Sequence, residues 1–316
     1  MSETPRSPFT PAVQALMDNI QRAGFPPVHT QPIEQARQSY KLGVGATAHP
    51  PLPMARVQDL TIPGPGGDMR ARLWAASTEP GLPVLLYLHG GGFVIGGIET
   101  CESMCTVLAQ HSGGAVVALD YRLAPENRFP AGLDDSFAAL QWLVEQGPSM
   151  GLDPSRIAVG GDSAGGTLAA STALLARDAG IPLVLQALFY PSVQLGMKTN
   201  SLLTYSANTL LSWDLMHWFE TNARGGELRQ RWHREPLHAP DHRGLAPAWI
   251  GLAECDPLTD EGVLYADRLR LAGVSVDLEI YTGVVHGFIQ FGRAIPEALT
   301  AHNDAARALR RAFGDH

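Results

Sequence analysis

The 316-residue sequence predicts an α/β fold in which a mostly parallel, eight-stranded sheet is flanked by helices and covered by a helical cap. Short apolar runs alternate with helical patterns along most of the chain, and one long segment carries helical patterns without a strand. Hydrophobic residues make up 45% of the chain and charged residues 17%, which favours a large buried core. Alternating strands and helices are typical of parallel sheets covered on both faces.

The chain opens with two helical patterns, at residues 10–23 and 31–43, in which apolar residues recur every three or four positions. A proline-rich passage, residues 46–53, separates them from the first strand. Eight apolar runs predict strands, at residues 56–62, 69–76, 83–88, 115–119, 156–160, 183–189, 247–253 and 275–281. Five further helical patterns lie at about 99–112, 133–147, 164–179, 258–272 and 297–313.

Residues 191–246 interrupt this alternation, with a helical pattern clearest from Ser212 to Asn222. An insertion of this length in a compact domain usually has a function. We expect residues 191–246, together with residues 1–50, to form a cap over the strand ends, where open α/β sheets bind ligands. Residues 51–190 and 247–316 would then form the core. A peripheral helical decoration is the alternative.

The composition argues against several classes of protein. A formal net charge of −8 disfavours a nucleic-acid groove, and no apolar stretch is long enough to span a bilayer. The first six residues lack the basic and apolar regions of a signal peptide, and three cysteines are an odd number for a disulfide framework. We therefore expect a cytoplasmic protein.

Two residue pairs with metal-like spacing have simpler interpretations. Cys101 and Cys105 are four apart on a predicted helix, where packed thiols are a better interpretation than a metal or redox site. His238 and His242 have the same spacing, but Pro240 between them argues against a helical metal pair. No metal site is predicted.

The most informative segment is Gly161-Asp162-Ser163-Ala164-Gly165, between an apolar strand and a helical pattern. A serine in such a sharp strand-to-helix turn has a strained backbone, and flanking glycines let the turn close. The turn raises the hydroxyl above the sheet at a helix N-terminus, where negative charge is stabilised. A phosphate loop is the alternative, but the Gly-Lys-Ser/Thr ending is missing. Ser163 is therefore predicted to be a nucleophile.

A serine nucleophile needs an imidazole base, and on this type of turn the acid and then the histidine follow the serine in the chain. Of eleven histidines, His286, His302 and His316 follow the acid candidates. His302 lies in the terminal helical pattern, and His316 is the last residue. His286 lies in a glycine-flanked loop after a predicted strand, and we predict it to be the base.

Three carboxylates compete for the role of the acid. Asp256 follows the strand predicted at residues 247–253, at the sheet edge where catalytic groups collect. Asp260 would begin the next helix, where a carboxylate complements the helix dipole, and Glu254 would end the strand. Asp256 is the preferred acid.

The segment His89-Gly90-Gly91-Gly92-Phe93 follows a predicted strand. Successive glycines let a turn aim its N–H groups at one point, where acyl transfer creates an alkoxide. The N–H groups of Gly91 and Gly92, with that of Ala164, would complete an oxyanion hole. His89 precedes the acid in the chain, so we interpret it as a structural anchor of the loop.

Together these motifs resemble the hormone-sensitive-lipase-like family of α/β hydrolases, the bacterial family IV carboxylesterases, over nearly the whole chain. The segments that carry the resemblance are His89-Gly90-Gly91-Gly92-Phe93, Asp120-Tyr121-Arg122-Leu123-Ala124-Pro125-Glu126, Phe129-Pro130-Ala131, Gly161-Asp162-Ser163-Ala164-Gly165-Gly166, Tyr190-Pro191, Asp256-Pro257-Leu258, Asp260-Glu261-Gly262 and His286-Gly287-Phe288.

The resemblance implies the α/β-hydrolase fold, with Ser163, Asp256 and His286 as a triad. It also implies a cap formed by N-terminal helices and an insertion after the sixth strand, no cofactor, and a cytoplasmic location in bacteria. Thr167 and Gln194 depart from the family pattern, in which an asparagine and an aspartate are common. These departures concern the pocket, not the triad.

The expected function is the hydrolysis of short- to medium-chain acyl esters through an acyl-enzyme. A non-catalytic small-molecule receptor on the same fold, or an amide or carbamate hydrolase, is the alternative. Five apolar residues would line the substrate pocket, although core packing is the preferred interpretation for the last four: Phe93, Leu210, Trp213, Met216 and Phe219.

The expected partner is a small ester, with no nucleic acid and no membrane span. The predicted strand at residues 275–281, with the last helix, would be a place for two subunits to pair as a homodimer.

Overall fold

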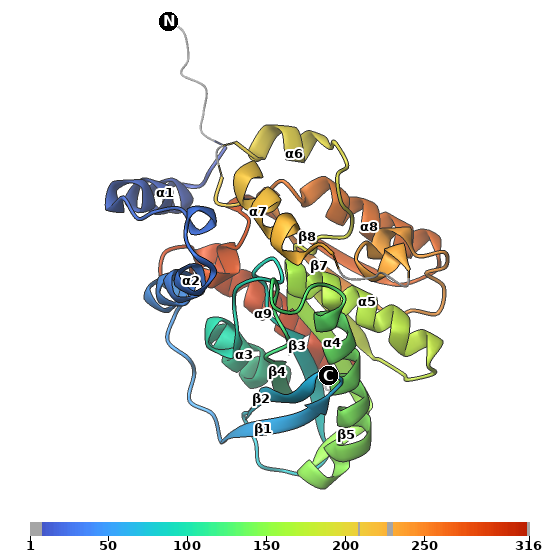
Figure 1. The fold of residues 1–316 in the computed structure, drawn as a ribbon. Helices are drawn as coiled ribbons and strands as arrows, with labels where there is room; N and C mark the ends of the chain where they lie inside the picture. Colours follow the sequence, from blue (N-terminus) through green and yellow to red (C-terminus); the bar gives the residue numbers. More distant parts are fainter. Residues whose placement is uncertain (1–7, 208, 226–229, 315–316) are drawn as a thin grey trace, which may run out of the picture.

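The computed structural model describes residues 8–207, 209–225 and 230–314. Its strands are β1 (Arg56–Gly64), β2 (Gly67–Ala75), β3 (Leu82–Leu88), β4 (Ala115–Leu119), β5 (Leu152–Asp162), β6 (Leu185–Phe189), β7 (Ala248–Cys255) and β8 (Val276–Val285). They form one sheet in the order β1-β2-β4-β3-β5-β6-β7-β8 (Figure 1). β2 is antiparallel to β1 and β4, and the other neighbours are parallel. The predicted fold class is confirmed.

The α-helices are α1 (Pro11–Ala23), α2 (Ile33–Thr47), α3 (Ile98–Ser112), α4 (Ala131–Gln146), α5 (Ala164–Asp178), α6 (Asn200–Tyr205), α7 (Trp213–Ala223), α8 (Thr259–Leu271) and α9 (Pro296–Ala312). The short 3-10 helices are η1 (Val28–Thr30), η2 (Gly147–Met150), η3 (Arg231–His233), η4 (Pro236–His238) and η5 (Phe288–Gln290). Among the described helices, none is both long and apolar enough to cross a lipid bilayer.

The second helix ends later than the pattern predicts. α2 continues to Thr47, although Gly43 and Gly45 lie inside it. Val44 is buried, and the Thr47 hydroxyl donates to the Gly43 carbonyl oxygen at 2.8 Å. Packing of Val44 therefore outweighs the low helix propensity of the two glycines.

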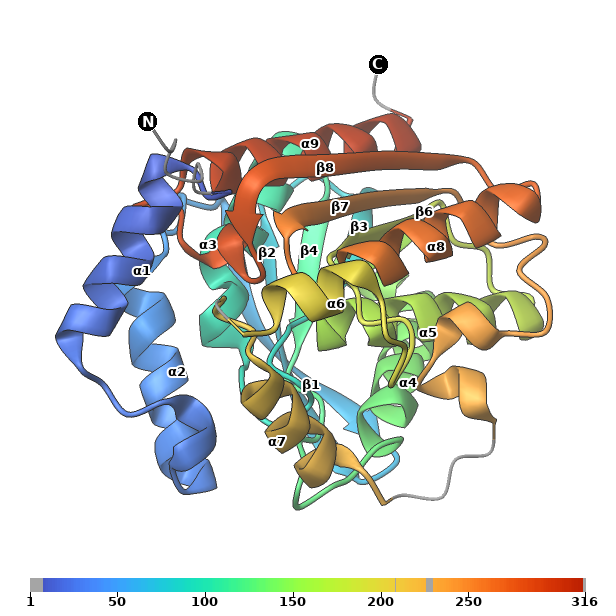
Figure 2. The same cartoon turned by 90° about the horizontal axis from the view of Figure 1, so that it is seen from above.

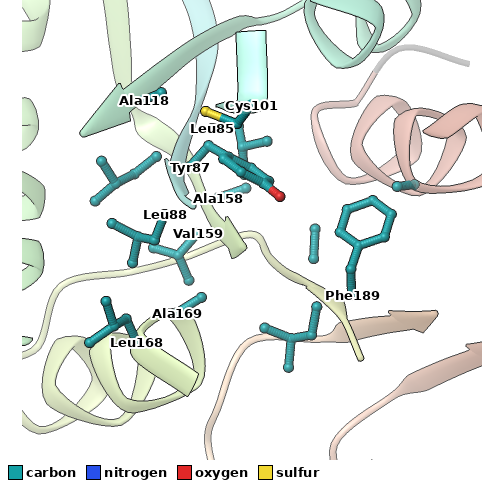
Figure 3. Packing of buried hydrophobic residues seen from close by; sticks show 14 of the residues in the cluster. Leu85, Tyr87, Leu88, Cys101, Ala118, Ala158, Val159, Leu168, Ala169 and Phe189 are labelled. Carbon is teal, nitrogen blue, oxygen red and sulfur yellow. The ribbon is translucent and has the colours of Figure 1, made fainter. Parts of the chain in front are cut away.

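Helices cover both faces of the sheet and seal its centre. α3 and α9 pack together on one face, and α4, α5 and α8 pack on the other (Figure 2). β3 and β4 are buried along their whole length, as expected for central strands of a parallel sheet. Figure 3 shows part of this packing, with Leu85, Tyr87 and Leu88 of β3, Ala158 and Val159 of β5, and Leu168 and Ala169 of α5. The strand ends are therefore supported by a closely packed core.

A second group of helices stands outside these two layers. In Figures 1 and 2, α1 and α2 lie beside α6 and α7, on one side of the sheet. η1 contacts α7, so the N-terminal segment meets the segment between β6 and β7 here, and α6 of that segment contacts α8. These are the segments, within residues 1–50 and 191–246, for which a cap is expected.

Candidate active site

Ser163 occupies the one-residue turn between β5 and α5. Its φ of 54° is a left-handed value that a non-glycine residue adopts only under strain. A Cβ on Gly161 would lie 2.4 Å from the Leu88 carbonyl oxygen, and one on Gly165 would lie 1.9 Å from it. Only glycine fits at these two positions, so they let the turn close against β3. The hydroxyl of Ser163 consequently stands at the N-terminus of α5, in the wall of a cavity.

The structure brings His286 and Asp256 to this serine. His286 directly follows β8, and Asp256 directly follows β7. His286 Nε2 lies 2.9 Å from Ser163 Oγ, and His286 Nδ1 lies 2.6 Å from Asp256 Oδ2. Asp256 is fully buried, and its other oxygen accepts the Leu258 N–H at 2.9 Å. A carboxylate on Nδ1 fixes the tautomer whose Nε2 is free to accept the serine proton.

The two other acid candidates have structural partners instead. Glu254 Oε2 accepts the Gly283 N–H at 2.7 Å, which braces the end of β8 before His286. Asp260 Oδ2 accepts the Ser201 N–H at 2.9 Å and thus holds the start of α6 on α8. Both carboxylates are accounted for by these contacts.

The other histidine candidates lie elsewhere. His302 is buried in α9, with its ring 5.6 Å from the ring of His49, and burial lowers the pKa of His302 to about 3. His316 lies outside the described residues.

Gly91 and Gly92 form a tight turn after β3, with φ values of 116° and 60°. A Cβ on Gly91 would lie 2.1 Å from the Ile95 carbonyl oxygen, and one on Gly92 would lie 2.1 Å from the Phe219 ring of α7. In the described part of the chain, the N–H groups of Gly91, Gly92 and Ala164 have no hydrogen-bond acceptor. All three residues line the same cavity as Ser163, so their donors are available to a ligand there.

Asp162 links the serine turn to this glycine loop, a role that the sequence did not reveal. Its Oδ1 accepts the Tyr87 hydroxyl at 2.7 Å and the Gly90 N–H at 2.9 Å. Its Oδ2 lies 3.5 Å from Gln290 Nε2, and Gln290 Oε1 accepts the Tyr40 hydroxyl of α2 at 2.8 Å. Burial raises the pKa of Asp162 above its ordinary value, although the hydrogen bonds from Tyr87 and Gly90 oppose this rise. Hydrogen bonds therefore run from α2 through Asp162 to the glycine loop.

His89 and Glu126 lie behind this loop. The His89 ring stacks on Tyr121 at 4.3 Å, and the Tyr121 hydroxyl donates to the His89 carbonyl oxygen at 2.7 Å. Glu126 accepts two hydrogen bonds from Arg37 of α2, and Arg37 also donates to the Val94 carbonyl oxygen. These contacts fit a structural role for His89.

A cavity of about 620 Å³ lies between the strand ends and the helices α2 and α7. The five residues expected at a substrate pocket all line it: Phe93, Leu210, Trp213, Met216 and Phe219. Trp213 is 57% exposed, so core packing is the wrong interpretation for that side chain. The polar part of the wall includes Gln194, which the sequence marked only as a departure from the family pattern, and Arg234 and Glu261, for which the sequence gave no sign of a place in the pocket.

Among the described residues, no group of three or more His, Cys, Asp or Glu side chains is arranged to hold a metal ion. His242 Nε2 lies 2.9 Å from the Pro236 carbonyl oxygen. All three cysteines carry free, buried thiols: Cys101, Cys105 and Cys255.

Known proteins resemble this chain in sequence and in structure. The alpha/beta hydrolase fold family matches residues 85–290. The carboxylesterase NlhH of Mycobacterium tuberculosis is 40% identical over 83% of this chain and 84% of its own length. An ethyl acetate hydrolase of Pseudomonas putida is 36% identical over 86% and 88%. The solved structure of an ester hydrolase from the Lake Arreo metagenome is 36% identical, with a TM-score of 0.93 over 97% of this chain and 99% of that chain.

Proposed function

This chain belongs to the alpha/beta hydrolase fold family, and from that premise we propose that it hydrolyses carboxylic esters of short to medium acyl chain through a serine nucleophile. The chain is an esterase of the hormone-sensitive-lipase-like group, as the similarity to named carboxylesterases at 36–40% identity establishes. The observation that carries the mechanism is the hydrogen-bonded row Asp256–His286–Ser163, with distances of 2.6 Å and 2.9 Å.

In the proposed reaction, Ser163 Oγ attacks the ester carbonyl carbon while His286 Nε2 takes the hydroxyl proton. Asp256 keeps the imidazole in the required tautomer and stabilises its charged form. The tetrahedral intermediate collapses as His286 protonates the leaving alcohol, which leaves an acyl-enzyme on Ser163. Water then attacks the acyl carbon, again with His286 as base, and the carboxylic acid leaves.

The negative charge on the carbonyl oxygen needs donors that are in place before the reaction. We assign this role to the N–H groups of Gly91, Gly92 and Ala164, which border the same cavity as Ser163. The N-terminal end of α5 adds its partial positive charge. Each such donor is typically worth about a hundred- to a thousand-fold in rate.

The proposed cap consists of residues 1–50 and 191–246, and the substrate would lie between it and the strand ends. A cavity of about 620 Å³ accepts a small ester, and side chains such as Leu210 and Met216 offer an apolar wall for the acyl or alcohol chain. The proposed location is the cytoplasm, because three buried free thiols suit a reducing compartment. β8 is an edge strand, which makes it the proposed place for homodimer pairing.

The proposal is tested by hydrolysis of a p-nitrophenyl ester series from acetate to decanoate. We expect turnover that is highest for short and medium chains and that Ser163→Ala abolishes. Turnover that survives Ser163→Ala would overturn the assignment of the nucleophile. A maximum at decanoate would overturn the assigned chain length only.

A further inference from the structure

The cavity wall contains a buried cation that the proposed reaction does not use. Arg234 follows η3, and its side chain is only 11% exposed. Its guanidinium carbon lies 4.5 Å from the centre of the Phe93 ring. Phe93 directly follows the Gly91-Gly92 pair, and Arg234 and Ser163 line the same cavity. A positive charge is therefore fixed close to the proposed site of chemistry.

Among the described residues, the charge of Arg234 has an ion-pair partner at long distance only. Its Nη1 atom is buried without a hydrogen-bond partner. The ion-pair partner is the carboxylate of Glu220. Its Oε2 lies 3.8 Å from Arg234 Nη2, which is beyond hydrogen-bond distance. The other oxygen of Glu220 already accepts Arg224 Nε at 3.1 Å. A buried guanidinium in this state is costly unless an anion joins it.

The other acids of the wall are occupied. Glu235 accepts two hydrogen bonds from Arg231, each of 2.9 Å. Glu261 accepts the Val193 N–H at 2.8 Å, and burial raises the pKa of Glu261 to about 8, so it is largely neutral at pH 7. Gln194 is also buried, and its Nε2 has no partner in the described part of the chain. The side chains of this wall thus include two buried donor atoms without a partner in the described part of the chain, and most of its carboxylates are already paired or neutral.

We propose that Arg234, with Gln194 in the wall of the same cavity, forms a carboxylate subsite, so that the ester substrates of this enzyme carry a free carboxylate. The planar guanidinium matches a carboxylate with two parallel hydrogen bonds, and the apolar wall holds the chain between the carboxylate and the ester. This inference rests on the proposed esterase function and deepens it. The carboxylate can belong to the acyl part or to the alcohol part of the ester, and the test has one arm for each.

The acyl arm compares monoethyl adipate with its neutral counterpart ethyl heptanoate. The alcohol arm compares ω-acetoxyvalerate with hexyl acetate, and a pH-stat follows the acid released in both arms. The variants are Arg234→Met, which keeps apolar volume above Phe93, and Arg234→Lys, which keeps the charge. Arg243→Met is the matched control, because Arg243 belongs to the same segment, pairs with Asp241 and is exposed.

In the arm whose ester places its carboxylate at Arg234, we expect Arg234→Met to lower kcat/KM for the anionic ester about 10- to 100-fold, which is the usual contribution of a charge-assisted hydrogen bond. The neutral ester should change by less than about threefold, since it makes no such bond. Arg234→Lys should retain part of the anionic activity, and Arg243→Met should retain all of it. Equal losses for the anionic and neutral esters in both arms would overturn the subsite and indicate a structural role for Arg234.

A binding measurement separates the subsite from the proposed chemistry. Calorimetry on Ser163→Ala, which should not turn the esters over, should detect tighter binding of the anionic ester than of its neutral counterpart in one of the two arms, and adding Arg234→Met should remove the difference. Equal binding of the anionic and neutral esters by Ser163→Ala in both arms overturns the subsite. A wild-type protein that cleaves no ester contradicts the proposed function, while the calorimetry still decides the subsite. Circular dichroism and the Tm of each variant establish that it is folded.

Discussion

The strand ends and the helices above them are built in opposite ways. At the strand ends, Asp256 is fully buried, and both of its carboxylate oxygens have partners within the chain. In the helices above, Leu203 of α6 is 67% exposed and Trp213 of α7 is 57% exposed. The cavity wall on that side also contains Arg234 Nη1 and Gln194 Nε2, which lack partners within the described residues.

This difference indicates a division of labour. Reacting groups need fixed geometry, which the closely packed sheet supplies through the turns after β5, β7 and β8. Recognition of a substrate needs unsatisfied groups and exposed apolar surface, which the helices supply. Substitutions at the strand ends should therefore change kcat. Substitutions in the helices should change the preference of the enzyme among esters.

The largest expected effect is that of Ser163→Ala. Loss of the nucleophile should lower kcat for p-nitrophenyl butyrate by about 10⁶-fold, as in other enzymes with such a triad. The Tm should not fall, because the change removes no packing. Ser171→Ala on the same helix is the control and should keep full activity. A normal kcat for the Ser163→Ala variant would contradict the assignment of the chemistry to the strand ends.

Asp256→Asn should come next, with a loss of about 10⁴-fold in kcat, because an amide stabilises the wrong tautomer of His286. The matched control is Asp260→Asn, since Asp260 binds the Ser201 N–H of α6 rather than the imidazole. We expect Asp260→Asn to change kcat by only a few-fold, within what a lost surface contact explains. A larger loss of kcat for Asp260→Asn than for Asp256→Asn, measured on the same ester, would assign the role of the acid to Asp260 instead of Asp256.

Gly92→Ala tests the contact between the glycine loop at the strand ends and the Phe219 ring of α7. The new Cβ would lie 2.1 Å from the Phe219 ring at a φ of 60°, so the loop must shift. Misplacing an oxyanion donor should lower kcat about 100- to 1000-fold. Gly81→Ala has a similar φ of 79° with no atom within 4 Å of its Cβ, and it should leave kcat unchanged.

The double variant Gly92→Ala/Phe219→Ala removes the clash and should recover part of the lost kcat. A double variant as slow as Gly92→Ala alone would mean that α7 does not govern the position of the loop.

Glu261→Gln should change stability rather than kcat. Burial raises the pKa of Glu261 from 4.5 to about 8, so the folded protein holds a proton that the unfolded chain has lost between these values. Its contribution to stability is present below pH 4.5 and is lost as the pH rises towards 8, by up to about 1.4 kcal/mol per pH unit. Urea unfolding at pH 6 and pH 8 should show a steeper loss for the wild type than for Glu261→Gln. Parallel slopes contradict the raised pKa.

The smallest effect belongs to Trp213→Ala. This exposed side chain lines the cavity, so its loss should raise KM for longer acyl chains by a few-fold, about what a partly buried aromatic contributes. Kcat for the acetate ester and the Tm should stay unchanged. An equal fall in kcat for every chain length would mean that Trp213 contributes to the chemical step rather than to the preference among acyl chains.

Much of the fold could be predicted because central parallel strands are buried on both faces and therefore appear as continuous apolar runs. All eight strands were expected near their observed places, although β5 begins at Leu152, four residues before the expected start. The end of α2 at Thr47 could not be predicted, since its contacts involve residues distant in sequence, such as Arg293, whose N–H donates to the Thr47 carbonyl oxygen at 3.0 Å.

The candidate site was predictable where chemistry depends on local pattern or chain order. A strained serine turn selected Ser163. The rule that the histidine comes last left three histidines, and the glycine-flanked loop after a predicted strand selected His286. The link from Tyr40 through Gln290 to Asp162 was not predictable, because it joins three distant parts of the chain. Arg234 was missed for the same reason.

The central claim is that chemistry resides at the strand ends, and covalent labelling by a fluorophosphonate tests it most directly. Intact-mass and peptide mass spectrometry should find one adduct per chain, on Ser163. His286→Ala should slow the labelling by several orders of magnitude, and Trp213→Ala should leave the modified residue unchanged. An adduct on any other residue, or unchanged labelling of His286→Ala, would contradict the account.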